Sequence, residues 1–134
     1  MKPLGIEEVL WVKPGEGIAA TGHIPQDAEF FKDHFPGFPV LPGVLALEML
    51  RISAEFYFRS QGIEDAALRM RRLSAVRFSK YLQPGDTWQS ELLLKPGAEA
   101  PLSLWAGRLF CHGEVAVTAR LELELIQKTR KIIA

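Results

Sequence analysis

The chain has 134 residues, 48% hydrophobic and 24% charged, which excludes a disordered chain and predicts one soluble domain spanning residues 1–134. Sixteen basic and sixteen acidic side chains cancel, which argues against nucleic acid or an anionic membrane as the main partner. A single cysteine excludes an internal disulfide, and the lack of a secretory signal or a membrane-length apolar run predicts a cytoplasmic protein outside the membrane.

The first elements in chain order are a hairpin, a stiff loop and a helix. Pro14-Gly15-Glu16-Gly17 followed by an apolar stretch predicts a turn between two strands. Five proline and glycine residues between positions 36 and 43 predict an irregular loop with a rigidly shaped backbone. No breaker follows until residue 61, so residues 42–61 are predicted to form a helix with Pro42 in its first turn.

Apolar residues cover most of the circumference of this helix, so we expect it to be buried on nearly all sides. Four strands are then predicted at residues 68–78, 87–95, 103–112 and 114–126, separated by Pro-Gly and His-Gly turns. These elements predict an α+β fold in which about five antiparallel strands curl around one helix. Such a sheet leaves an edge or a face open, so we expect a second copy to pair with it.

Three groups around the helix start suggest acid/base chemistry. His34 lies in the proline-rich loop and has a side chain suited to accept a proton near neutral pH. Gly43 leaves the backbone N–H groups of the helix start accessible to a carbonyl oxygen that gains negative charge. Glu48 lies on an otherwise apolar helix, where a carboxyl group can remain protonated and donate its proton.

The same residues also have structural interpretations. Most histidines in loops are structural or solvated, because few histidines in any protein are catalytic. Glu48, Arg51 and Glu55 have the three- and four-residue spacing of a solvated ion-pair stripe. On these residues alone the stripe is favoured over catalysis, and Glu55 is as good a candidate carboxylate as Glu48.

Residues 34–48 contain His-Phe-Pro-Gly, a further proline, Pro-Gly and a final glutamate. This run resembles the signature of the 3-hydroxyacyl-acyl carrier protein dehydratases of type II fatty-acid synthesis. Residues 78–86 are similar to that family's Phe-x-x-x-x-x-Pro-Gly-Asp segment, and residues 113–117 resemble its closing strand. The resemblance covers nearly the whole chain and implies the hot-dog fold, a dimer as the minimum unit with possible further assembly, and an acyl tunnel beside the central helix.

The resemblance also implies roles for individual residues. His34 matches the catalytic histidine, Glu48 the catalytic acid, and Gly43 the residue whose N–H contacts the thioester carbonyl. The residues expected to line the substrate site are Phe35, Gly37, Phe38, Pro42 and Val44. The implied reaction removes water from a 3-hydroxyacyl group on acyl carrier protein, with no metal or other cofactor, at sites shared between two chains.

One departure from the family pattern bears on the acid. Typical members continue with small residues and a glutamine four positions after the acid, whereas Arg51 and Ile52 follow Glu48 here. A cation at Arg51 that reaches Glu48 would favour the ionised carboxylate and weaken its role as an acid. This departure allows one alternative, a non-catalytic subunit that binds the carrier protein. A separate alternative is a hot-dog acyl thioesterase, which would use the carboxylate to activate water.

Two weaker signals lie in the second half of the chain. Five basic residues and no acidic one lie between Asp65 and Asp86, a patch that either docks an acidic carrier protein or is an exposed strand face. His23 and His112 have no other metal-ligating residue at a suitable spacing except Cys111, which is not expected to chelate readily together with its neighbour His112.

Overall fold

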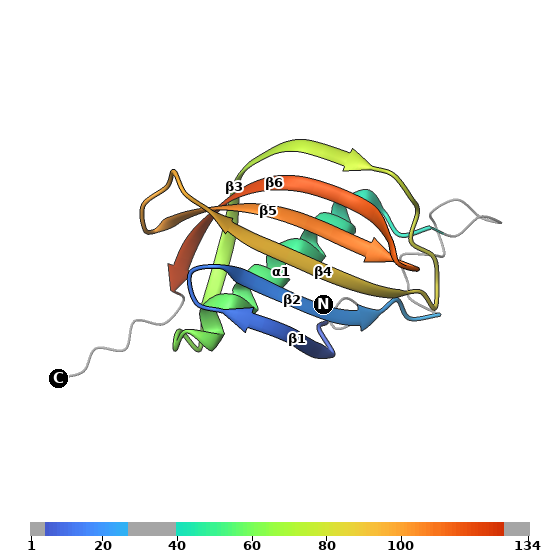
Figure 1. Cartoon of the computed structure of the whole chain (residues 1–134), viewed down its shortest axis with the longest axis horizontal. Coiled ribbons are helices and arrows are strands. Elements are labelled where there is room, and N and C mark those ends of the chain that lie inside the picture. The colour runs from blue at the N-terminus through green and yellow to red at the C-terminus, as the bar shows by residue number, and fades with distance from the viewer. Residues whose placement is uncertain (1–4, 27–39, 128–134) are drawn as a thin grey trace.

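A computed structural model of the chain describes residues 5–26 and 40–127. In chain order the elements are β1 (Glu8–Lys13), β2 (Gly17–His23), α1 (Gly43–Ser60), β3 (Ala66–Phe78), β4 (Thr87–Lys95), β5 (Leu102–Cys111) and β6 (Glu114–Gln127). The strands form one antiparallel sheet in the order β1-β2-β4-β5-β6-β3. Figure 1 shows this sheet curling around α1, which confirms the predicted α+β arrangement.

The predicted helix and turns are confirmed in position. The helix begins one residue later and ends one residue earlier than predicted, with Pro42 as its N-cap instead of inside the first turn. His112 and Gly113 both have positive φ, 54° and 75°, as a two-residue turn between twisted strands requires. The sheet has six strands instead of about five, because residues 8–13 form a separate strand that pairs along its length with β2.

The core lies between α1 and the concave face of the sheet. Its largest fully buried side chains include Trp88, Trp105, Met49, Leu50, Leu92 and Leu121. Gly107 of β5 lies where core side chains pack tightly, because a Cβ there would be 3.1–3.2 Å from the side chains of Leu92 and Leu121 of the sheet and Leu50 of the helix. No helix in the described part of the chain has the length and hydropathy needed to cross a bilayer.

Aromatic rings fix the C-terminal end of α1. The rings of Tyr57 and Trp105 meet edge to face at 5.2 Å, and Phe58 packs at 5.3 Å from Tyr57. The Tyr57 hydroxyl accepts a hydrogen bond of 2.7 Å from the Gly15 N–H in the β1–β2 turn. One turn earlier, the hydroxyls of Ser53 and Ser90 share a buried hydrogen bond of 2.7 Å that joins the helix to β4. This end of the helix is therefore held by both apolar and polar contacts.

β3 forms one edge of the sheet and pairs only with β6 (Figure 1). Its register shifts twice, between Met70 and Arg72 and between Ser74 and Arg77, where Ala75 has a φ of 52°. Residues 71–80 are all exposed. Bulges of this kind bend and twist an edge strand and interrupt its pairing.

Candidate functional site at the start of the helix

The N-terminus of α1 has hydrogen-bond donors that find no acceptor in the described part of the chain. Pro42 provides no side-chain cap, and the first turn has no acidic residue. The N–H groups of Leu45 and Ala46 both donate to the Pro42 carbonyl, whereas those of Gly43 and Val44 donate to no group among residues 5–26 and 40–127. Because the helix dipole is positive at this end, the two N–H groups suit an oxygen atom that carries negative charge.

An apolar pocket of about 320 Å³ lies beside these donors. Its lining combines Val40, Leu41, Gly43, Ala46, Phe78, Leu82 and Val117 with the polar-tipped Lys80 and Tyr81. Phe78 packs against the helix start, because a Cβ on Gly43 would lie 2.9 Å from Phe78 Cζ. Glycine at position 43 therefore allows the ring to approach and keeps the backbone N–H open to the pocket.

Glu48 lies on the same helix, one and a half turns from its start, and is bound by Arg51. Arg51 Nε lies 3.0 and 3.1 Å from the two carboxylate oxygens of Glu48, and Arg51 Nη2 lies 2.6 Å from Oε2. The Glu48 side chain is 38% exposed and that of Arg51 is 20% exposed. Arg51 therefore does reach Glu48, the condition under which the sequence argued for a weaker acid role, and Glu48 accepts three hydrogen bonds from it.

The second carboxylate of the stripe, Glu55, has a structural environment. Its side chain is only 11% exposed, and its Oε2 accepts hydrogen bonds from Arg51 Nη1 at 2.6 Å and from the Leu68 N–H at 2.8 Å. Arg51 Nη1 also donates to the Leu68 carbonyl at 3.1 Å, which closes a ring of hydrogen bonds between α1 and β3. Hydrogen bonding to Glu48 raises the pKa of Arg51, against the lowering effect of burial, and the charges of both carboxylates add to the rise.

From their spacing in the sequence, Glu48 and Glu55 were equally good candidates for the acid, but their environments in the structure differ. Glu55 is anchored to β3, whereas Glu48 is the more exposed carboxylate and has Arg51 as its partner. Neither is part of a purely solvated stripe, because Arg51 joins both to a buried backbone carbonyl.

The site residues predicted from the sequence are only partly covered by the structure. Gly43, Pro42 and Val44 lie together at the helix start, with Gly43 in the pocket lining and Val44 67% exposed. His34, Phe35, Gly37 and Phe38 lie outside the described residues, so their positions stay predictions. Sequence reasoning missed Phe78 as a pocket residue, although it begins the Phe-x-x-x-x-x-Pro-Gly-Asp segment.

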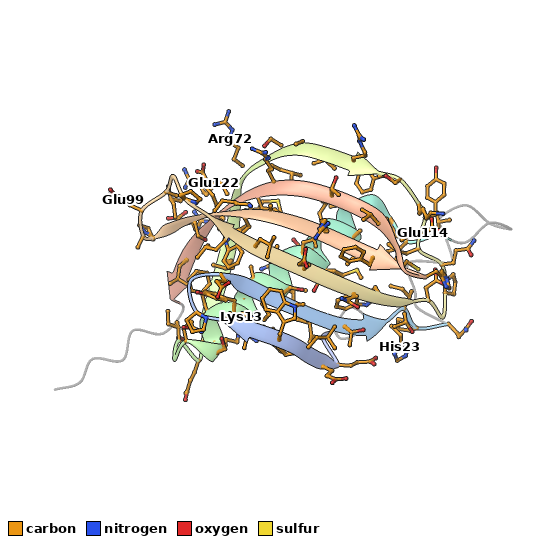
Figure 2. All side chains as sticks on the ribbon, viewed as in Figure 1. Lys13, His23, Arg72, Glu99, Glu114 and Glu122 are labelled. Carbon is orange, nitrogen blue, oxygen red and sulfur yellow. The ribbon has the colours of Figure 1, made fainter. Side chains whose placement is uncertain are left out.

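The basic patch on β3 is partly neutralised. Arg69 and Arg71 lie 3.9 and 3.0 Å from Glu124 Oε1, and Lys80 lies 2.5 Å from Glu114. A hollow of about 550 Å³ on the β3–β6–β5 side of the sheet gathers a different set of cations: Arg72, Lys95 and Arg120, with Glu122 and the small Ala106 among its other lining residues. Figure 2 shows Arg72 projecting from the β3 edge.

The interpretation of Cys111 and His112 overlooked a third side chain. Asp86 Oδ1 lies 3.1 Å from His112 Nε2, and one ligand-type atom from each of Asp86, Cys111 and His112 falls within 4.8 Å of the others. Burial, followed by the charge and hydrogen bond of Asp86, raises the pKa of the Cys111 thiol to about 11. This cluster does not line the pocket at the helix start.

Comparisons with known proteins agree with this architecture. A family model described as ApeI dehydratase, ApeI-like, matches residues 12–109. The 3-hydroxyacyl-[acyl-carrier-protein] dehydratase FabZ of Polynucleobacter necessarius subsp. necessarius (strain STIR1) is 32% identical over 120 residues, covering 87% of this chain and 78% of that protein. FabZ of Lactobacillus helveticus (strain DPC 4571) is 33% identical over 123 residues, covering 91% and 80%.

Solved structures share the fold at lower identity. The dehydratase heterocomplex ApeI:P from Xenorhabdus doucetiae contains a chain that is 21% identical with a TM-score of 0.75, covering 96% of this chain and 87% of that one. The PaaI protein of E. coli is 12% identical with a TM-score of 0.66, covering 93% and 82%. The hot-dog fold expected from the sequence is confirmed.

Proposed function

Because the chain belongs to the ApeI-like dehydratase family, we propose that it converts 3-hydroxyacyl thioesters on acyl carrier protein to trans-2-enoyl thioesters in fatty-acid or related lipid or polyketide-like synthesis. The observation that carries the proposal is the pair of N–H groups at Gly43 and Val44, which have no acceptor within residues 5–26 and 40–127. They lie beside an apolar pocket and on the helix that bears Glu48. These parts suit a thioester carbonyl, its acyl chain and a leaving hydroxyl.

In the proposed reaction His34 removes a proton from the carbon next to the thioester carbonyl. The negative charge that develops on the carbonyl oxygen is stabilised by the Gly43 N–H and the positive end of the helix dipole. Glu48 protonates the 3-hydroxyl as its C–O bond breaks, so that water leaves and a double bond forms between the two carbons. The balance is one 3-hydroxyacyl thioester to one enoyl thioester and one water.

The Glu48–Arg51 ion pair bears on the role of Glu48 in both directions of this reversible reaction. An ion-paired carboxylate has no proton to give, so dehydration requires that Glu48 first be protonated. In the reverse direction, hydration of the enoyl group, the same carboxylate is the base that takes a proton from water.

Hydration of an enoyl thioester, followed by loss of its ultraviolet absorbance, tests the proposal. Wild-type protein should hydrate crotonyl or longer substrates, and His34→Ala and Glu48→Gln should each lose at least about 100-fold in kcat/KM. Glu99→Gln, a change to a carboxylate in the β4–β5 loop away from the site, should have no effect (Figure 2). Full activity in either site variant, with circular dichroism unchanged, would remove the assigned roles.

The ion pair also favours a second candidate, a non-catalytic subunit that binds an acylated carrier protein. In that case wild-type protein would bind the acyl carrier protein but would hydrate neither crotonyl nor longer enoyl thioesters. A hot-dog thioesterase would instead release a free thiol from the acyl thioester. Measuring the enoyl absorbance and the released thiol in the same reaction distinguishes all three functions.

For the carrier protein we propose a docking face formed by Arg72, Lys95 and Arg120, the three cations that line the hollow on the sheet. In residues 5–26 and 40–127 none of the three has an ion-pair partner within 4.0 Å, so they attract an acidic surface more strongly than Arg69 and Arg71 do. Carrier affinity should fall as salt is raised, and Arg120→Gln should weaken it more than Arg71→Gln.

We further propose a homodimer that uses the β3 edge, one of the two edges of the sheet in the described part of the chain, the other being β1. Static light scattering of the protein as it leaves a size-exclusion column measures the mass of the assembly directly. A monomer that is fully active would contradict both the dimer and the sharing of each site between two chains.

A further inference from the structure

A cluster of three ligand-type side chains lies at the opposite end of β5 from the β4–β5 loop. Asp86 precedes β4, Cys111 ends β5, and His112 is the first residue of the β5–β6 turn. A carboxylate oxygen, the thiol sulfur and a ring nitrogen from these residues all lie within 4.8 Å of one another. The proposed dehydration uses none of them.

The register of the sheet brings the three residues together. Trp88 of β4 pairs with Cys111 of β5, so Asp86, two residues before Trp88, lies beside the turn that follows Cys111. Neighbouring residues on a strand normally point to opposite faces. The positive φ of His112 takes it out of the strand pattern, and its Nε2 comes to lie 3.1 Å from Asp86 Oδ1.

Asp86 is held in one orientation by a second hydrogen bond. Its Oδ2 accepts the Gln83 N–H at 2.8 Å, which leaves Oδ1 directed toward His112. A bond that fixes the far atom of a ligand is a regular feature of metal sites, where it orients the ligand. In a tetrahedral zinc site with bonds of about 2.0–2.2 Å, ligand oxygen and nitrogen are about 3.3 Å apart, close to the separation found here.

We propose that Asp86, Cys111 and His112 form a binding site for a single Zn²⁺ or a similar transition-metal ion, with a fourth position for water. One sulfur, one nitrogen and one oxygen donor suit zinc or cobalt, whereas Mg²⁺ and Ca²⁺ prefer oxygen ligands alone. The His112 side chain is 77% exposed, so the ion has access from solvent and the ring can turn toward the buried Cys111.

The bound ion would join two segments, the first of which borders the helix start. One is the β3–β4 connection, in which the Leu82 carbonyl accepts the Leu41 N–H at 2.7 Å, next to the N-cap Pro42. The other is the β5–β6 turn, which carries His112. Because metal binding to the folded state alone raises stability, the ion should stabilise the end of the molecule that holds the proposed site.

The test uses the full chain, stripped of metal with a chelator and titrated with Co²⁺. The chain has one cysteine, so a thiolate-to-cobalt charge-transfer band can arise only from Cys111. We expect this band to saturate at one cobalt per chain, to disappear when Zn²⁺ displaces cobalt, and to be absent in Cys111→Ser. Zinc should raise the melting temperature of the wild type and not that of Cys111→Ser.

Two conservative variants test the other ligands. Asp86→Asn keeps an oxygen for the Gln83 N–H, and His112→Asn keeps a residue that tolerates positive φ. Each should weaken cobalt binding by at least about tenfold. His23→Asn is the control: this histidine pairs with Thr87, next to Asp86, but its ring contacts Glu7 and is not part of the cluster, so binding should be unchanged (Figure 2).

A wild-type protein without the charge-transfer band, or cobalt binding that survives in Cys111→Ser with equal affinity, would overturn the proposal. Enoyl hydration is a separate readout, because His34→Ala should lose activity and retain cobalt binding. Failure of the metal site and failure of the dehydratase assignment are therefore distinguishable.

Discussion

The two ends of α1 differ in how completely their hydrogen-bonding groups are paired and their apolar side chains buried. At the C-terminal end the Tyr57 and Trp105 rings are buried against each other, and the Tyr57 hydroxyl accepts a backbone N–H. At the N-terminal end the Gly43 and Val44 N–H groups have no acceptor in the described part of the chain, and the apolar side chains of Val44 and Phe78 are exposed. Groups left unsatisfied in a folded domain mark where a substrate or a partner binds, whereas the satisfied end stabilises the fold.

The largest change in stability should come from the satisfied end. Trp105→Ala removes a buried ring from contact with Tyr57 and Phe58 and should lower the free energy of unfolding by about 3–5 kcal/mol. Val44→Ser at the open end should change it by less than about 0.5 kcal/mol. Urea denaturation measures the free energy of unfolding of both variants. Equal losses would mean that the two ends of the helix contribute equally to stability.

The second largest effect tests the ring of hydrogen bonds in the middle of the helix. Glu55→Gln leaves Arg51 with one carboxylate instead of two and should destabilise the protein by about 2 kcal/mol, less than the full loss of a buried pair because Arg51 retains Glu48. Glu124→Gln breaks the more exposed pair with Arg71 and should cost less than about 1 kcal/mol. The prediction fails if the two variants unfold at the same urea concentration.

A smaller loss of stability is expected when the buried hydroxyl pair of Ser53 and Ser90 is broken. Ser53→Ala leaves the Ser90 hydroxyl without its partner and should cost about 1–2 kcal/mol. The double variant Ser53→Ala/Ser90→Ala should cost less than the sum of the two single variants, because no hydroxyl is then left unpaired. Additive losses in the denaturation midpoints would show that the two hydroxyls do not interact.

The smallest change in stability, with a large change in activity, is expected at the open end. Gly43→Ala should alter the free energy of unfolding by less than about 1 kcal/mol, because the Phe78 ring is exposed and can move aside. The displaced ring should enter the pocket and lower enoyl thioester hydration. Adding Phe78→Leu should restore part of the activity, and no recovery would mean that the ring is not the obstacle.

The sequence predicted the elements well because local patterns encode them. The helix boundaries follow from the absence of breakers after Pro42, and the turns follow from their Pro-Gly and His-Gly pairs. The predicted hairpin implied a strand before residues 14–17, but the count of about five strands left β1 out, because its six residues have little alternation and mostly exposed side chains.

The candidate site was less predictable, because its geometry depends on contacts between distant segments. Periodicity gave the face of the helix on which Glu48 and Glu55 lie, but not that Leu68 of β3 would bind Glu55 and Arg51. The position of Phe78 against Gly43 and of Asp86 against His112 depends on strand register, which a single sequence does not specify.

The exposed edge of β3 has a consequence for handling the purified protein. Two identical copies that meet along this edge bring Arg72 and Arg77 of one chain toward the same cationic strand of the other. Repulsion between like charges is screened by dissolved ions, so self-association should tighten as ionic strength rises, opposite to the behaviour of a contact made by ion pairs. Buffers of low ionic strength would then favour separated chains, and multivalent anions such as phosphate would hold copies together.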